Sequence, residues 1–405
     1  MRTRPAIALT TAATLAASVL LLPASANADA AVTVTVEAIP APAKSEPAPA
    51  AKPPFKGKRP AVDVALLLDT SNSMDGLINQ AKAQLWKIVN RFADAKRNGK
   101  TPVLRVALFE YGNTRLPASE GYLRQVVPLT DDLDTVSEAL FALATSGGDE
   151  YCGQVINEAV KRLDWSGEPG GYRAIFIAGN EPFTQGAVAY QKACKRAIEL
   201  GIVVNTIHCG AYAAGVSGQW AHGAELAEGC YLNIDQDLAV GRIDAPQDKI
   251  IIELSRRLND TYLWYGAGAR KFALNQRAQD ANAESFAPAT AADRGIAKAS
   301  SGYSNRGRDL VDTFNADSSS LDEIDAEQLP EPLRKMKPAE RLARIKELSA
   351  ERTTLQQKIR ELSTQREKFL AEARAKADGS GEATLADAVT AAIDEQLVDA
   401  GFDRE

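Results

Sequence analysis

Short apolar runs alternate with longer helical patterns from residue 62 onward, and this alternation restricts the fold of the 405-residue chain more than any other feature. Strands that are apolar almost throughout are typical of parallel sheets covered by helices on both faces. We therefore predict an α/β domain over residues 61–240, with a doubly wound, mostly parallel sheet. The predicted strands are residues 62–69, 104–111, 172–179, 202–210 and 230–234. The predicted helices between them are residues 77–98, 135–143, 153–163, 187–200 and 219–227.

Residues 1–28 have the pattern of a secretory signal peptide. Arg2 and Arg4 precede an apolar run at 6–22, and Ala26-Asn27-Ala28 has the small residues of a cleavage site. An uncleaved membrane anchor is the alternative, because about 17 apolar residues are just enough to span a thin bilayer. No later stretch reaches the roughly 20 apolar residues that a membrane helix needs. We therefore expect a periplasmic or secreted protein with no membrane span after cleavage.

The composition argues against several kinds of partner and metal centre. Asp and Glu (53) outnumber Lys and Arg (47), and the resulting net charge of −6 disfavours binding to nucleic acid. The chain has two His and four Cys, with no CxxC or HExxH spacing, so a zinc site of ordinary spacing is not expected. Residues 29–60 include a Pro/Ala-rich stretch, a composition typical of an extended linker.

The strand pattern ends near residue 245, and we predict helices and loops over 245–337. A seven-residue repeat of apolar positions over 338–377 predicts a coiled-coil helix, and a short amphipathic helix is predicted at 382–400. A second series of positions with the same seven-residue spacing would complete the apolar seam of the coiled coil. Arg352 and Arg366 fall in this second series and weaken the repeat. Two arrangements remain open: the long helix folds back on the α/β domain, or it associates with a second copy into a homo-oligomer.

Asp69-Thr70-Ser71-Asn72-Ser73 directly follows the first predicted strand. Parallel sheets bind ligands at the carboxyl ends of their strands, so this turn would direct one carboxylate and two hydroxyls into a common crevice. A hard cation such as Mg²⁺ takes about six oxygen ligands, and neighbouring loops, water and a partner's acidic side chain would supply the remainder. The alternative is that Asp69 and Ser71 only cap the following helix.

With this motif, residues 61–240 resemble the von Willebrand factor type A family. The resemblance rests on the segment VALLLDTSNSM after a buried strand, on the strand and helix alternation, and on the order of the loops. It implies a metal-ion-dependent adhesion site that begins with Asp69, Ser71 and Ser73, and a binding function without catalysis. The family's second loop supplies a Thr to this site, and its third loop supplies an Asp.

The second and third loops of this chain depart from that family pattern. Asp149 follows Gly147-Gly148 in the place of the usual Thr. The third loop reads Gly179-Asn180-Glu181-Pro182 where similar proteins have an Asp-Gly pair. We expect Asp149 to be the next ligand, with Glu181 or Asn180 contributing directly or through water. Mg²⁺ is the expected ion, and Mn²⁺ and Ca²⁺ are alternatives.

The loop at 210–220 opens near the same edge of the predicted sheet and is rich in Gly and Ala. Its aromatic residues Tyr212 and Trp220 suit a surface that selects the partner. The alternative is that Trp220 packs beneath the following helix.

An oxidising compartment would allow disulfides among Cys152, Cys194, Cys209 and Cys230, and we prefer a Cys152–Cys209 pair. A cysteine hydrolase with Cys152 as nucleophile and His208 as base is a different class of function. It lacks an orienting third residue, and GxSxG, P-loop and GxGxxG motifs are also missing, so no enzyme activity is expected. The remaining alternative is a metal-free scaffold of the cell envelope that oligomerises through its coiled coil.

Overall fold

The computed structural model describes residues 59–404 except Asp94, 168–169, 235–242, 322–323 and 377–384. The predicted signal peptide at 1–28 and nearly all of the predicted linker lie outside the described residues. Within the described ranges, no helix is both long enough and apolar enough to cross a membrane.

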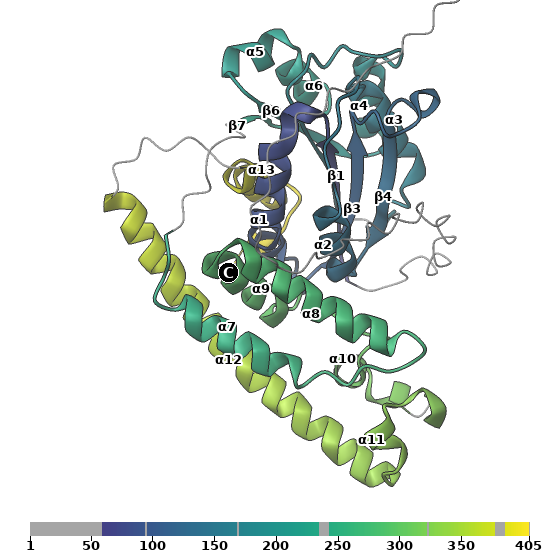
Figure 1. The fold of residues 1–405 in the computed structure, drawn as a ribbon, viewed down its shortest axis with the longest axis vertical. Helices are drawn as coiled ribbons and strands as arrows, with labels where there is room; N and C mark the ends of the chain where they lie inside the picture. The colour runs from purple at the N-terminus through teal and green to yellow at the C-terminus, as the bar shows by residue number, and fades with distance from the viewer. Residues whose placement is uncertain are drawn as a thin grey trace, which may run out of the picture. The chain divides into compact units, whose positions relative to one another are not determined.

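One six-stranded sheet forms the centre of the fold, in the strand order β4-β3-β1-β5-β6-β7 (Figure 1). Five of its strands run parallel, and β4 is antiparallel to β3 at one edge. This arrangement confirms the predicted doubly wound, mostly parallel sheet. The strands are β1 (Ala61–Asp69), β3 (Val103–Tyr111), β4 (Leu123–Thr130), β5 (Tyr172–Gly179), β6 (Val203–Cys209) and β7 (Tyr231–Ile234).

The edge strand β4 is the one strand of this sheet that the apolar pattern does not predict. It contains Arg124, Gln125 and Pro128, and only two of its eight residues are buried. An edge strand is covered on fewer sides than a central one, so it carries no continuous apolar run.

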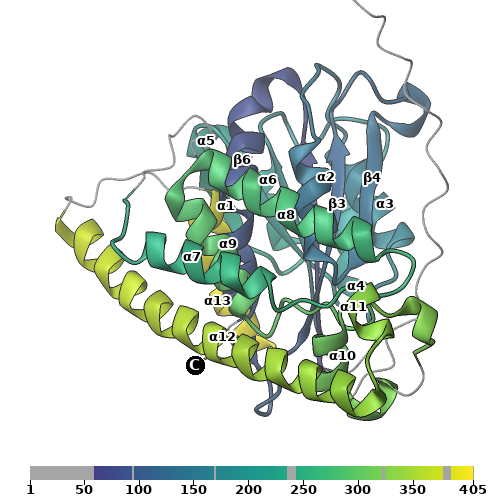
Figure 2. The same cartoon turned by 60° about the horizontal axis from the view of Figure 1, so that its bottom comes forward.

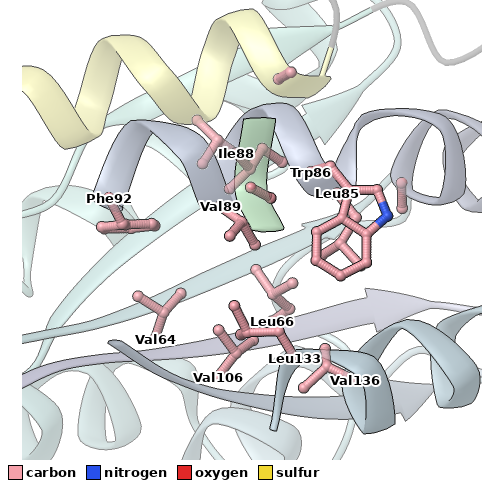
Figure 3. Close-up of a cluster of buried hydrophobic side chains, with 14 of the residues drawn as sticks. Val64, Leu66, Leu85, Trp86, Ile88, Val89, Phe92, Val106, Leu133 and Val136 are labelled. Carbon is pink, nitrogen blue, oxygen red and sulfur yellow. The ribbon is translucent and has the colours of Figure 1, made fainter. Parts of the chain in front are cut away.

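Helices cover both faces of the sheet. The face with Val64 and Leu66 packs against α1, α2 and α13, and Figure 3 shows Trp86 and Val89 of α1 above these two residues. The opposite face, with Leu67, packs against α3, α4 and α6. The bounds are α1 (Asp75–Ala93), α2 (Leu133–Phe141), α3 (Cys152–Arg162), α4 (Tyr190–Glu199), α5 (Tyr212–Ser217), α6 (Trp220–Glu225) and α13 (Leu385–Asp399). The α5 segment is helical, although it was predicted to be loop.

Further helices follow the sheet domain and pack on its α1 and α2 side, where α9 contacts α1 and α8 contacts α2. The long helix α12 lies beside α7 (Figure 2). The bounds are α7 (Asp248–Asn259), α8 (Ala269–Phe286), α9 (Pro288–Ala299), α10 (Leu310–Ala316), α11 (Glu331–Arg334) and α12 (Pro338–Lys376). A short antiparallel pair, β2 (Ala95–Lys96) with β8 (Asp403–Arg404), joins the segment after α1 to the last described residues.

The helix predicted at 338–377 is present as α12, and its apolar seam faces other helices of the same chain. The seam residues Ile345, Leu348, Leu355, Ile359 and Leu362 are buried. The helix folds back on its own chain, but its main contacts are with α7, α9 and α10, which follow the α/β domain, and not with that domain as predicted. A second copy would need the same seam residues for a coiled coil, so self-association through the seam would first require the intrachain packing to open.

The two seam arginines are also paired within the chain. Arg352 is 1% exposed, and its Nη1 lies 2.7 Å from Asp309 Oδ2 and 2.5 Å from Asp312 Oδ1. Arg366 Nε lies 2.6 Å from Asp248 Oδ1 in the same way. These arginines weaken a coiled-coil seam, but they fit a seam that faces aspartates on neighbouring helices.

We predict that Arg352→Ala lowers the free energy of unfolding by about 3–5 kcal/mol, because Asp309 stays buried without its countercharge. Urea denaturation of the full chain measures this loss. Arg344→Ala is the control, since Arg344 pairs with Glu347 on the exposed face of the same helix. The control is expected to cost less than about 1 kcal/mol. Equal losses in the two variants would contradict the assigned role of Arg352.

Candidate metal centre

The loop after β1 holds the predicted Asp69-x-Ser71-x-Ser73 motif at the carboxyl end of the sheet. Asp69 is 0% exposed, and its Oδ1 accepts a hydrogen bond of 2.7 Å from the Ser71 backbone N–H. The hydroxyls of Ser71 and Ser73 lie 3.1 Å apart. The Ser71 hydroxyl accepts no capping hydrogen bond from the backbone N–H groups of the short helix that follows, so capping does not account for it. The motif therefore brings its three oxygen-bearing side chains together.

The second loop places Glu150 beside Asp69, in the position expected of Asp149. Glu150 is buried, and its carboxyl group contacts Asp69 and Ser71. Asp149 is exposed, and its Oδ2 accepts a hydrogen bond of 3.0 Å from the Tyr151 hydroxyl. Sequence reasoning identified the correct loop, but the adjacent acidic residue is the one that faces the motif.

The third loop contributes Asn180. Its Nδ2 lies 3.2 Å from Ser73 Oγ, and its backbone carbonyl lies 3.3 Å from His208 Nε2. Glu181 is exposed, and its carboxylate accepts a hydrogen bond of 3.3 Å from Gln185 Nε2. The structure gives the Glu181 side chain no contact with Asp69 or Ser71 among the described residues. Of the two alternatives for this loop, Asn180 is the one that joins the motif.

Two glycines leave the space that these side chains occupy. A Cβ on Gly112, which has φ +76°, would lie 2.7 Å from Asp69 Oδ1 and 2.9 Å from Glu150 Cγ. A Cβ on Gly179 would lie 2.5 Å from the Tyr111 hydroxyl and 3.1 Å from Asp69 Oδ2. A larger residue at Gly112 would push into both carboxyl groups, and one at Gly179 would push into the Tyr111 hydroxyl and Asp69, so the backbone leaves space for these side chains.

The pKa shifts of the Asp69 and Glu150 pair follow from its burial. Burial raises the pKa of Asp69 well above its usual range, and the contact with Glu150 raises it further. Burial also raises the pKa of Glu150, although contacts with Asp69, Ser71 and the Glu181 backbone act in the opposite direction. Two adjacent buried carboxyl groups repel when both are ionised, and either a shared proton or a cation relieves the repulsion.

The available oxygens fit a hard cation. Asp69 Oδ2 and Asn180 Oδ1 are both buried and receive no hydrogen bond. With Glu150, Ser71 and Ser73, they form a set of carboxylate, amide and hydroxyl oxygens, which is the chemistry that Mg²⁺, Mn²⁺ and Ca²⁺ prefer. In the described part of the chain, no three His, Cys, Asp or Glu side chains converge as a metal cluster. A site here therefore depends on the hydroxyl and amide oxygens as well as on the two carboxylates.

The aromatic residues of the 210–220 segment have different roles. Tyr212 lies on α5 and is 63% exposed. Trp220 is buried, and its Nε1 donates a hydrogen bond of 2.8 Å to the Glu181 carbonyl. The alternative reading of Trp220 as a packing residue is therefore correct. Gly215 of α5 backs onto His208, so α5 is connected to the third loop through His208 and Asn180.

The predicted Cys152–Cys209 disulfide is wrong. No disulfide links any of the four cysteines, including the further candidates Cys194 and Cys230. Cys152 packs in the core on the α3 and α4 side of the sheet, whereas Cys209 packs on the α1 side. The two cysteines therefore lie on opposite faces of the sheet, and sequence position alone did not reveal this.

The environment of Cys152 argues against the cysteine hydrolase alternative. The Cys152 thiol is buried 3.8 Å from the Tyr111 hydroxyl, and burial raises its pKa well above the usual range. A nucleophilic cysteine needs the opposite shift, toward a stable thiolate.

A doubly wound sheet with an Asp-x-Ser-x-Ser turn at its carboxyl edge defines an α/β domain with a candidate cation site. Residues 63–219 match the family model of the von Willebrand factor type A domain, and the chain therefore contains a domain of that family. No curated protein matches the chain.

Several solved structures resemble the chain. The conserved hypothetical protein BatB from Bacteroides thetaiotaomicron is 19% identical, with 43% of this chain and 91% of that chain covered and a TM-score of 0.33. An aerotolerance-related membrane protein from Bacteroides fragilis is 17% identical, with 44% and 94% covered and a TM-score of 0.31. Proximal thread matrix protein 1 from the mussel byssus, with a zinc-occupied MIDAS motif, is 14% identical, with 44% and 43% covered and a TM-score of 0.34. The chain thus matches less than half of the mussel protein.

We predict that the metal-free protein loses stability as the pH rises above about 4, where Asp69 of the unfolded chain ionises. The folded state holds a proton on the Asp69 and Glu150 pair at pH values where the unfolded chain has released it. The stabilisation is therefore complete at acid pH and is lost as the pH rises through the raised pKa of Asp69. Urea denaturation in chelator, over a pH series, measures this trend. Asp69→Asn should flatten the pH dependence, and parallel profiles for the two proteins would contradict it.

Proposed function

We propose that the von Willebrand factor type A domain binds a divalent cation, with Mg²⁺ as the first choice, at the carboxyl end of β1. The observation that carries this proposal is the pair of buried oxygens, Asp69 Oδ2 and Asn180 Oδ1, that receive no hydrogen bond. Leaving buried polar atoms without a partner is costly, and a cation between the three loops would satisfy both of them.

Each residue of the site would have a distinct role. Asp69 and Glu150 would supply negative charge, and Ser71 and Ser73 would supply hydroxyl oxygens. Asn180 would supply a neutral amide oxygen from the third loop. The chain would then retain two carboxylates at its metal, with one of them moved from the third loop to the second.

We further propose that the bound cation accepts an acidic side chain of a partner protein, and that the chain acts in binding and not in catalysis. Two carboxylates formally neutralise a divalent ion, so the attraction for a third would be modest and neighbouring surfaces would have to contribute. Tyr212 and Val216 on α5 are 63% and 43% exposed, and they offer apolar contact beside the third loop. The signal-peptide pattern at 1–28 supports a location outside the cytoplasm.

The first test is metal binding itself. We predict that isothermal titration with Mg²⁺ gives saturable binding to the wild type, and that Asp69→Asn and Glu150→Gln weaken it at least tenfold, because each removes one of the two proposed charged ligands. Asp149→Asn is the matched control: it removes an adjacent carboxylate that faces Tyr151, and it should bind like the wild type. Flat titrations of folded wild-type protein with Mg²⁺, Mn²⁺ and Ca²⁺ would refute the proposed site. A loss confined to Asp149→Asn would move the ligand to that residue.

The second test concerns the partner. We predict that the immobilised chain captures a protein from a periplasmic extract in Mg²⁺, and that EDTA and Asp69→Ala both abolish the capture. Asp149→Asn should leave the capture intact. Capture that is indifferent to chelation and to Asp69→Ala would count against metal-mediated binding. It would favour the alternative of a metal-free scaffold, which sedimentation of the whole protein would test directly by its oligomeric state.

A further inference from the structure

Three side chains from three helices meet in the interior of the C-terminal region, away from the metal centre. Lys298 of α9 is 0% exposed, and its Nζ lies 2.6 Å from the Oδ1 of Asn259, the last residue of α7. The same Nζ lies 2.9 Å from Oδ2 and 3.1 Å from Oδ1 of Asp280 on α8. Asp280 Oδ2 also accepts a hydrogen bond of 2.7 Å from Asn259 Nδ2.

We propose that Lys298 and Asn259 join covalently through an intramolecular amide bond, with Asp280 as the proton carrier. A lysine amine that touches a side-chain amide brings a nucleophile to an acyl group. One carboxylate oxygen that touches both the amine and the amide nitrogen connects the two atoms between which a proton must move. Such fixed proximity gives intramolecular reactions a large advantage over the same groups free in solution.

The reaction balances without an oxidant, reductant or co-reactant. The lone pair of neutral Lys298 Nζ attacks Asn259 Cγ, and a new C–N bond forms. Asp280 accepts a proton from Nζ and delivers it to Asn259 Nδ2. The bond between Cγ and Nδ2 then breaks, and ammonia leaves. If Lys298 begins as the ammonium, its extra proton leaves with the product as an ammonium ion.

Burial lowers the pKa of Lys298, and the charge of Arg294 acts in the same direction, whereas the charge of Asp280 raises it. The net direction is downward, which makes the neutral amine more accessible than on an exposed lysine. Burial raises the pKa of Asp280, but the positive charges of Lys298 and Arg294 outweigh it and bring the pKa to about 2. The carboxylate is therefore ionised beside the lysine ammonium, and it can take the proton that the amine must release before it attacks. Arg294 Nε holds Asp280 Oδ1 at 2.9 Å, which leaves Oδ2 directed at the lysine and the asparagine.

The bond would link α7 covalently to α9, and α8 would lie within the closed loop of chain between them. Cross-links of this kind restrict the unfolded chain, which is how disulfides stabilise small domains in the chain-entropy account. No disulfide links any of the four cysteines, so the amide would provide a covalent link that the thiols do not. It forms once per molecule and is not reversed by a reductant.

Peptide mapping of the purified full-length protein by mass spectrometry tests the proposal. The expected result is one linked peptide that contains both Asn259 and Lys298, at the summed mass of its two parts less one ammonia, with no tryptic cleavage after Lys298. Lys298→Arg and Asp280→Asn should each give the unlinked peptides at full mass. Lys271→Arg, which changes an exposed lysine on α8, should retain the link.

The proposal can also be tested without any variant. Wild-type protein that circular dichroism shows to be folded is kept at neutral and at alkaline pH and then mapped in the same way. Recovery of the free Lys298 peptide at full yield would overturn the proposal and leave the triad as a buried ion pair. A linked peptide that persists unchanged in Asp280→Asn would overturn the proton-carrying role of Asp280. None of these outcomes depends on whether the domain binds a cation.

Discussion

The burial of Asp69 at the end of the central strand is the constraint on which the candidate site depends. All nine residues of β1 are buried, and the strand ends in a carboxylate beside a second buried carboxyl group, Glu150. An isolated buried charge is strongly unfavourable unless it is paired or neutralised. Only one oxygen of Asp69 is stabilised by a backbone N–H of the turn. The fold therefore favours a proton or a cation at this edge, and the two compete for the same oxygens.

The strands were predictable where burial on both faces fixes the composition, and less so elsewhere. β1, β3, β5 and β6 lie inside the sheet and carry apolar runs that few other structures tolerate. The edge strand β4 and the helix α5 are partly exposed, so their sequences are free to vary and give weak signals. The long helix α12 was predictable from its spacing, but not its partners: Arg352 pairs with Asp309, 43 positions away in the chain.

In the candidate site, too, some residues were predictable from the local sequence and others were not. Asp69, Ser71 and Ser73 belong to one turn, so their convergence follows from the local sequence once the strand is known. Glu150 comes from a separate loop, where two acidic residues stand side by side, and the direction of each is set by the packing of the start of α3. Asn180 follows β5, and its backbone carbonyl contacts His208 of the neighbouring strand β6. Such directions follow from tertiary packing, which no motif spacing encodes.

The C-terminal helices hold α1, the helix that follows the Asp69 turn, in its place. Arg294 of α9 stacks on Trp86 of α1, with 4.2 Å from its guanidinium carbon to the ring centre, and its Nη1 lies 2.7 Å from Asp134 Oδ1 of α2. These contacts fix α9 against the outer side of α1, the helix that follows the Asp69 turn, and α13 packs on α1 as well. A partner therefore cannot displace α1 sideways without breaking buried ion pairs. Ser73 in this turn is exposed, and so is most of α5, which has no charged residue, so a partner can reach the edge along this surface.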